Sequence, residues 1–175
     1  TRPRKALRLY ARGDGPFEYQ LFADKAVDEF DTFILRNGGN DWGNGVIRDL
    51  YLQSLAENTG LDRQYGRPAL VFLNGEYWGL HDLRERFDDG YAEHNYGLKE
   101  DEYVQVEIDN ASASPYVPIY DCGNETLGGD FSNLWDYVRT NDLANPVHYA
   151  AVQDRLAVDS FIDFYQANVF FANTD

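Results

Sequence analysis

The chain has 175 residues, an apolar content of 43% and a formal net charge of −15, which suit one acidic domain, or one and a half, with a real hydrophobic core. This charge disfavours nucleic acid and anionic lipid as partners, and no apolar stretch approaches the ~20 residues that span a membrane. Cys122 is the single cysteine, which excludes an internal disulfide and a cysteine zinc site.

The first part of the sequence has strand patterns separated by turns. Apolar and polar residues alternate over 5–11, and the patterns over 17–22 and 31–36 also predict strands. Residues 23–30 fit either a loop or one helical turn. Residues 37–45 are rich in Gly and Asn and are expected to form a loop, which lacks the Lys-Ser/Thr pair of a phosphate-binding P-loop.

A helix is predicted next, over about 45–58. Asn44 can cap its start, and Gly60 lies just past its end. Its apolar stripe, at helical spacing, consists of Val46, Ile47, Leu50, Tyr51 and Leu55.

The clearest local signal is a hairpin centred on Asn74-Gly75. The apolar run 69–73 predicts one strand, and 77–83 predicts the returning strand. Asn and Gly both tolerate the positive φ that a tight turn requires. Because the first strand is apolar throughout, we expect it to lie inside a sheet, with Val71 and Leu73 buried.

Charged residues end the second strand of this hairpin. Arg84, Glu85 and Arg86 follow its apolar part directly. Such a strand end is a common place for a ligand, but it also fits an ordinary solvated end of a strand. The pattern alone leaves both interpretations open.

The middle of the chain alternates short elements with irregular segments. Residues 87–96 predict a short helix that ends at Gly97, and residues 103–108 alternate as a strand. Residues 109–129 are rich in Ser, Pro, Gly and Asn, and we expect them to form a long surface excursion.

The last segment has helical periodicity. Asp130 can cap a helix over 131–140, and Pro146 suits the first turn of a helix that runs to about Leu156. Asp159 can cap the last helix. The predicted buried face of that helix consists of Phe161, Ile162, Tyr165 and Val169.

The order of these elements predicts an α+β fold, because strands come first and helices last. A single domain over 1–175 would then have three parts. A sheet-rich N-terminal lobe with one helix would cover 1–108, a surface excursion 109–129, and a helical C-terminal lobe 130–175.

Charge is distributed unevenly along the chain. Residues 1–12 hold five of the 15 basic residues. Residues 87–175 hold three basic and 17 acidic residues, a local net charge of −14. Such a surface can attract cations or basic polypeptides, and the alternative is that it serves solubility or adaptation to salt.

No metal-binding or hydrolase motif is apparent. The three His residues are scattered, and no Gly-x-Ser-x-Gly elbow exists. Asp163 and Asn168 have the spacing of a kinase catalytic loop, but on one continuous helix they would point about 140° apart. Asp163 is therefore interpreted as structural. Asp175 follows a predicted helix end, where a carboxylate can face a cleft.

Several stretches together resemble the CotH kinase family, which is named for a spore-coat protein. In order they are Lys5-Ala6-Leu7-Arg8, residues 33–41, Ile47-Arg48-Asp49, residues 73–79, Leu83-Arg84-Glu85, residues 159–164 and Ala172-Asn173-Thr174-Asp175. Each stretch is weakly specific, but this many in the same order is specific, and together they extend over nearly all of the chain.

The resemblance implies an atypical protein-kinase-like fold that binds ATP and Mg²⁺ and transfers phosphate to protein hydroxyl groups. It makes Asp175 the catalytic residue and brings Lys5 to the nucleotide phosphates. The residues that it assigns to the nucleotide site are Lys5, Arg8, Arg36, Arg84 and Glu85.

The match to the family pattern is incomplete. The family's Asn five positions after the catalytic Asp is missing, and so is its acidic metal motif. By this resemblance the metal ligands are expected beyond residue 175, and the 175-residue chain alone is expected to be inactive.

Two functions stay open at this level. The first is a kinase domain whose partners are a nucleotide and a protein substrate, with basic proteins as one candidate class. The required cation clamp on the phosphates and the acidic groups could face each other across a cleft between the two lobes. The second is a non-catalytic surface or scaffolding module that keeps the fold for interaction.

Overall fold

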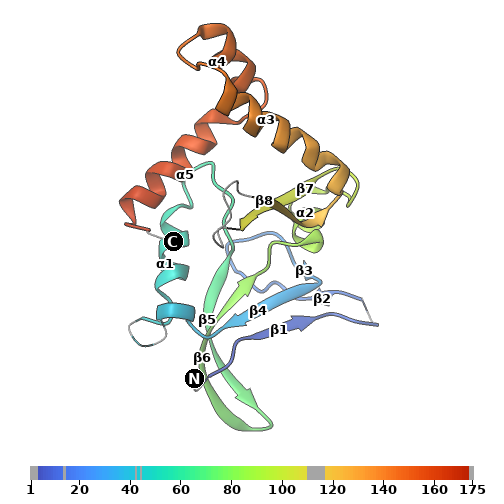
Figure 1. Cartoon of the computed structure of the whole chain (residues 1–175). Coiled ribbons are helices and arrows are strands. Elements are labelled where there is room, and N and C mark those ends of the chain that lie inside the picture. Colours follow the sequence, from blue (N-terminus) through green and yellow to red (C-terminus); the bar gives the residue numbers. More distant parts are fainter. Residues whose placement is uncertain (1–3, 14, 42, 44, 110–116, 174–175) are drawn as a thin grey trace.

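The computed structural model describes residues 4–13, 15–41, 43, 45–109 and 117–173 (Figure 1). The chain is a mixed α+β protein, as predicted. In chain order its elements are β1 (Leu7–Tyr10), β2 (Phe17–Glu18), β3 (Glu29–Phe30), β4 (Thr32–Arg36), a 3-10 turn (Gly39–Asp41), α1 (Arg48–Leu55), β5 (Gly66–Leu73), β6 (Glu76–Glu85), α2 (Asp89–Tyr96), β7 (Val104–Asp109), β8 (Val117–Gly123), a second 3-10 turn (Glu125–Leu127), α3 (Gly128–Thr140), α4 (Pro146–Gln153) and α5 (Val158–Phe170).

The main sheet has four antiparallel strands in the order β1-β4-β6-β5. β5 and β6 form the predicted hairpin, and positive φ at Asn74 (51°) and Gly75 (82°) confirms its two-residue turn. Within β6, only the end of the strand, Asp82–Glu85, pairs with β4. The rest of the hairpin therefore projects beyond the sheet (Figure 1).

The expectation that the first hairpin strand lies inside the sheet is wrong, because β5 is an edge strand. Pro68 suits this edge, since it has no amide hydrogen to donate to a further strand. Val71 is buried as predicted, but Leu73 is 36% exposed. Leu73 lies opposite Glu76, directly beside the turn at the tip of the projecting hairpin.

The register gives the main sheet two different faces. Arg8 lies opposite Ile34, and Ile34 lies opposite Arg84, so these three residues share one face. Glu85 follows Arg84 directly in β6 and therefore lies on the other face. α1 packs on the face of Arg84, whereas the hydrophobic core lies on the face of Glu85.

The core on the Glu85 face is formed by Leu21, Phe22, Phe30 and Leu83. The rings of Phe22 and Phe30 meet edge to face, with centroids 5.7 Å apart. The strand predicted over 17–22 is limited to β2, because the chain leaves the β2–β3 ladder and turns Leu21 and Phe22 into this core.

α1 is shorter than predicted, and none of its residues is buried. It begins after Ile47 without a side-chain cap, and the predicted cap Asn44 lies outside the described residues. Tyr51 and Leu55, two members of the predicted apolar stripe, are 61% and 47% exposed. The apolar stripe of α1 is therefore not covered as a hydrophobic core would be.

The segment predicted as a surface excursion contains a strand and the start of a helix. β8 pairs with β7 in an antiparallel ribbon, and α3 already begins at Gly128. β8 supplies the partner that β7 needs, because a lone strand leaves its backbone groups without hydrogen bonds. α2 ends at Tyr96, and Gly97 follows it with a left-handed φ of 67°, which agrees with the predicted end of this helix.

The C-terminal helices keep the predicted order. α4 begins at Pro146, and the side chain of Asn145 accepts a hydrogen bond from the amide of Val147 at 3.0 Å. Neither α3 nor α5 has a side-chain cap. The proposed caps Asp130 and Asp159 lie instead in the first turns of these helices, where carboxylates also favour the helix dipole.

The predicted buried face of α5 is wrong. No residue of α5 is buried, and the four expected core residues are exposed: Phe161, Ile162, Tyr165 and Val169. Periodicity identifies an apolar stripe, but burial also requires a surface that covers it, and these four side chains remain 43% to 67% exposed. Among all residues that the structure describes, no helix is both long and apolar enough to cross a membrane.

Candidate functional site

Four charged side chains meet between the main sheet and α1. We call this group the Arg–Asp cluster; it consists of Arg36 of β4, Asp49 of α1, and Asp82 and Arg84 of β6. Arg84 donates from Nη1 to Oδ2 of Asp49 and from Nη2 to Oδ2 of Asp82. Arg36 donates from Nη1 to the same Oδ2 of Asp49, at 2.6 Å. Two guanidinium groups thus share one carboxylate oxygen.

Strand register brings the cluster together. Arg36 lies directly opposite Asp82 in the β4–β6 ladder, and Asp82 and Arg84 are two residues apart on the same face. Gly66 of β5 lies opposite Arg84. A Cβ atom at Gly66 would lie 2.7 Å from Cδ1 of Leu50 and 3.0 Å from Oδ1 of Asp82, so the missing side chain lets α1 approach the sheet.

Two side chains of the cluster are buried, and the other two are accessible to solvent. The side chains of Arg84 and Asp82 are each 2% exposed, whereas those of Arg36 and Asp49 are 39% and 44% exposed. Arg36 is therefore the cation of the cluster that a ligand from solvent can reach. A partly exposed guanidinium suits an anionic ligand, above all a phosphate, which it can bind through two parallel hydrogen bonds.

Burial and the neighbouring arginines act in opposite directions on the two carboxyl groups. At Asp49 burial disfavours the ionised form, but Arg84 and Arg36 outweigh it and hold the pKa below its ordinary value. At Asp82 burial dominates over Arg84 and raises the pKa. Oδ1 of Asp82 and Nε of Arg84 are buried and have no hydrogen-bond partner among the described residues.

The glycine-rich loop after β4 packs against Arg36. A Cβ at Gly39 would lie 3.1 Å from Nη2 of Arg36, and Gly39 has a φ of 55°. Asn37 fixes the loop: its Oδ1 accepts from the amide of Gly39 at 3.3 Å, and its Nδ2 donates to the carbonyl of Arg4 at 2.7 Å. Glycine at 39 thus gives the guanidinium room beside the loop.

A second buried ion pair lies on the opposite face of the sheet. Lys25 donates to Oε1 of Glu85, and their side chains are 8% and 3% exposed. Oε2 of Glu85 accepts from the amide of Tyr65 at 2.9 Å, and Nζ of Lys25 lies 4.5 Å from the Tyr65 ring centroid and 5.1 Å from that of Tyr91. Burial lowers the pKa of Lys25 although Glu85 opposes this shift.

The structure brings together only some of the predicted site residues. Arg36 and Arg84 meet through Asp49, and Arg8 shares the face of Arg84, where it is exposed and donates to the hydroxyl of Tyr10 at 3.1 Å. Glu85 lies on the other face. Asp175, the predicted catalytic residue, lies outside the described residues.

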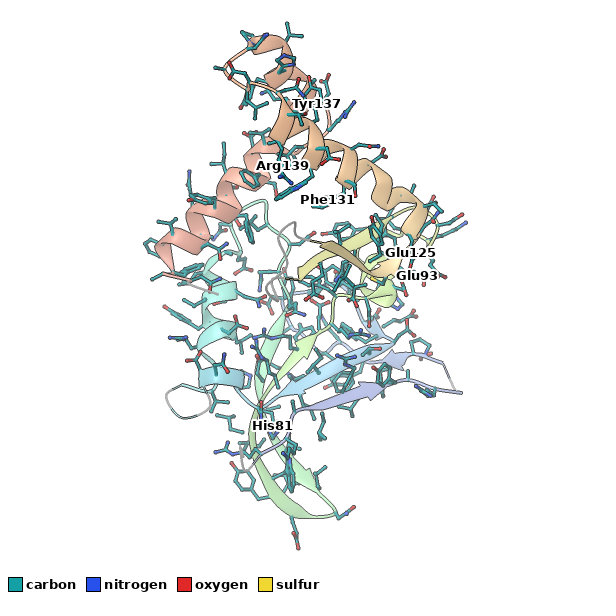
Figure 2. The ribbon with its side chains drawn as sticks, viewed as in Figure 1. His81, Glu93, Glu125, Phe131, Tyr137 and Arg139 are labelled. Atoms are coloured by element: carbon teal, nitrogen blue, oxygen red, sulfur yellow. The ribbon has the colours of Figure 1, made fainter. Side chains whose placement is uncertain are left out.

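Lys5 is exposed just before β1. Its carbonyl oxygen lies 3.1 Å from Nε2 of His81, and Figure 2 shows His81 at the root of the projecting hairpin. Within the described ranges no ion pair joins the Lys5 side chain to Glu85, which pairs with Lys25 instead. Its assignment to the nucleotide phosphates stays a prediction.

Sequence reasoning did not select Asp49, Asp82 or Lys25. Asp49 stood inside a quoted motif without an assigned role, and Asp82 lay within the predicted strand 77–83 without one. Lys25 fell in a segment with an ambiguous pattern. A lysine close to Leu21 and Phe22 was the one available signal, because a charge among core residues needs a buried partner.

Comparison with known proteins gives one match. The family model described as CotH kinase protein matches residues 1–175, the whole chain. Searches of curated proteins and of solved structures gave no significant match.

Proposed function

The chain belongs to the CotH kinase family, and we propose that its domain transfers the γ-phosphoryl group of ATP to protein hydroxyl groups. In this proposal the described residues form the phosphate-binding part of an atypical protein-kinase-like fold. The main sheet with α1 corresponds to its N-terminal lobe, and α3 to α5 begin the helical lobe.

The observation that carries the proposal is the contact between Arg36 of β4 and Asp49 of α1. In protein kinases a strand lysine pairs with a glutamate of the helix that follows, and this lysine meets the ATP phosphates. The present chain has a strand cation, a helix carboxylate and then a hairpin in the same order. We assign Arg36 to the phosphates, because it is the solvent-accessible cation of the Arg–Asp cluster, whereas Arg84 is buried.

The other predicted nucleotide residues take different roles in the proposal. Arg8 is an exposed cation on the same face of the sheet, so we assign it and Lys5 to the outer phosphate contacts. Arg84 and Glu85 are each 2% exposed, so direct contact with a nucleotide would require the site to open. We assign them to the support of the site.

The catalytic step rests on residues outside the described set. We propose that Asp175 orients the acceptor hydroxyl and takes its proton while the phosphoryl group moves to that oxygen and ADP leaves. Mg²⁺ would neutralise charge on the phosphates. The described residues contain no group of three or more His, Cys, Asp or Glu side chains placed to hold a metal ion, so we assign the metal to none of them.

ATP binding by the complete protein, measured by calorimetry with and without Mg²⁺, tests the proposal. Arg36→Met should weaken ATP binding about tenfold or more, because a charge-assisted contact is lost. Arg67→Met is the matched control, since Arg67 is exposed on β5, a strand of the same sheet. Equal ATP affinities of the two variants would refute the assignment of Arg36.

A non-catalytic interaction module is the second candidate, and the projecting hairpin favours it. Leu70, Phe72 and Tyr77 are 65%, 59% and 61% exposed there, which is an unusual apolar surface for a short ribbon. A complete protein that binds no ATP in the presence of Mg²⁺ would favour this function over the kinase.

A further inference from the structure

We infer that Arg84, supported by Asp82, is a positioning residue that fixes Asp49 and α1 on the sheet, so that Arg36 can exchange its contact with Asp49 for one with phosphate. This inference rests on the proposed function for the role of Arg36. The family resemblance assigned Arg84 to the nucleotide site, whereas its burial and its partners indicate a supporting role.

Apolar packing alone does not hold α1 in place. No residue of α1 is buried. The side chain of Leu50 packs close to Gly66 of the sheet. The ionic contacts of Asp49 join α1 directly to β4 and β6. An anchor of this kind is strong only if its cation is itself held rigidly.

Arg84 satisfies that condition. Its guanidinium bridges a fixed carboxylate of its own strand, Asp82, and the carboxylate of α1, Asp49. A third contact, from Nη1 to Oε1 of Gln64 at 3.4 Å, comes from the segment before β5. Lysine could not reproduce this bridge, because the planar fork of arginine presents two donors in fixed directions.

The charge balance explains how Arg84 affects Arg36. Oδ2 of Asp49 accepts hydrogen bonds from both arginines. When Arg36 turns to a phosphate, Asp49 keeps Arg84 as its partner and stays ionised and in place. Without Arg84, Asp49 would be a full counterion for Arg36 and would compete with the phosphate for it.

Hydrogen exchange of the complete protein without ATP tests the anchor. We expect the amides of Tyr51–Leu55 to exchange about tenfold faster in Arg84→Met and in Asp49→Asn than in the Arg67→Met control. Unchanged exchange in α1 of both variants would overturn the inference. If Arg84→Met fails to fold, Asp49→Asn decides, because its side chain is 44% exposed and Arg84 keeps Asp82.

A double-mutant cycle on ATP affinity tests whether Arg84 acts through Asp49. Both single variants should weaken ATP binding, and Arg84→Met/Asp49→Asn should be no weaker than the worse single variant. Additive losses would show that Arg84 acts independently, which would overturn the positioning role. If the wild-type protein binds no ATP, the proposed function fails, while hydrogen exchange still decides whether Arg84 anchors α1.

Discussion

Replacing Lys25 with Met should lower the free energy of unfolding by about 3–5 kcal/mol, because Glu85 would keep a buried charge without its cation. The Glu85 side chain is 3% exposed, so solvent cannot replace the lost partner. The amide of Tyr65 would remain as a donor to Oε2, but one neutral donor does not balance a full charge.

Thermal unfolding followed by circular dichroism measures this loss. For a chain of this size about 1 kcal/mol corresponds to 2–4 °C in Tm, so Lys25→Met should lower the Tm by about 6–20 °C. The matched control is Lys99→Met, which removes an exposed lysine and should change stability by less than about 0.5 kcal/mol.

A double variant separates the buried charge from lost packing. In Lys25→Met/Glu85→Gln both charges of this buried pair are removed, and the Gln oxygen can still accept from the Tyr65 amide. Most of the lost stability should therefore return. A loss in Lys25→Met no larger than that of Lys99→Met, or no recovery in the double variant, would refute the reasoning.

Three further predictions concern the site. The pKa of Asp49 is lowered in the folded state, so its ionised form stabilises the fold above about pH 4, and this contribution is lost as the pH falls below that value. In Asp49→Asn the free energy of unfolding should therefore depend less on pH below about pH 4 than in the wild type. Gly39→Ala should cost about 1 kcal/mol and weaken ATP binding, because its φ of 55° is strained for Ala and Cβ crowds Arg36, whereas Gly43→Ala, with open space around its Cβ, should leave ATP binding unchanged. Asp175→Asn should lower the phosphoryl-transfer rate by about 10²–10⁴ and leave ATP affinity nearly intact; full activity would contradict its role as base.

Local chemistry made parts of the fold predictable. Asn74-Gly75 determined the hairpin turn because both residues accept positive φ, and Pro146 marked the start of α4 because its ring suits a first helical turn. Burial was harder to predict, since it depends on distant segments. Leu73 and the apolar stripe of α5 have core-like residue types, but their side chains are 36% to 67% exposed in the structure.

The candidate site shows the same division. Arg36 and Arg84 were selected through the family resemblance, and in the structure each contacts Asp49. Their common partner Asp49 and the Lys25–Glu85 pair depend on how α1 and the loop before β3 fold onto opposite faces of the sheet. No spacing in the sequence encodes those contacts, because the partners lie 13 to 60 positions apart.

Transfer of radiolabelled γ-phosphate from ATP by the complete protein tests the central claim most directly. The kinase proposal predicts Mg²⁺-dependent labelling of protein hydroxyl groups by the wild type, with strongly reduced labelling in Arg36→Met and unchanged labelling in Arg67→Met. No labelling by a wild-type protein that binds ATP would contradict phosphoryl transfer.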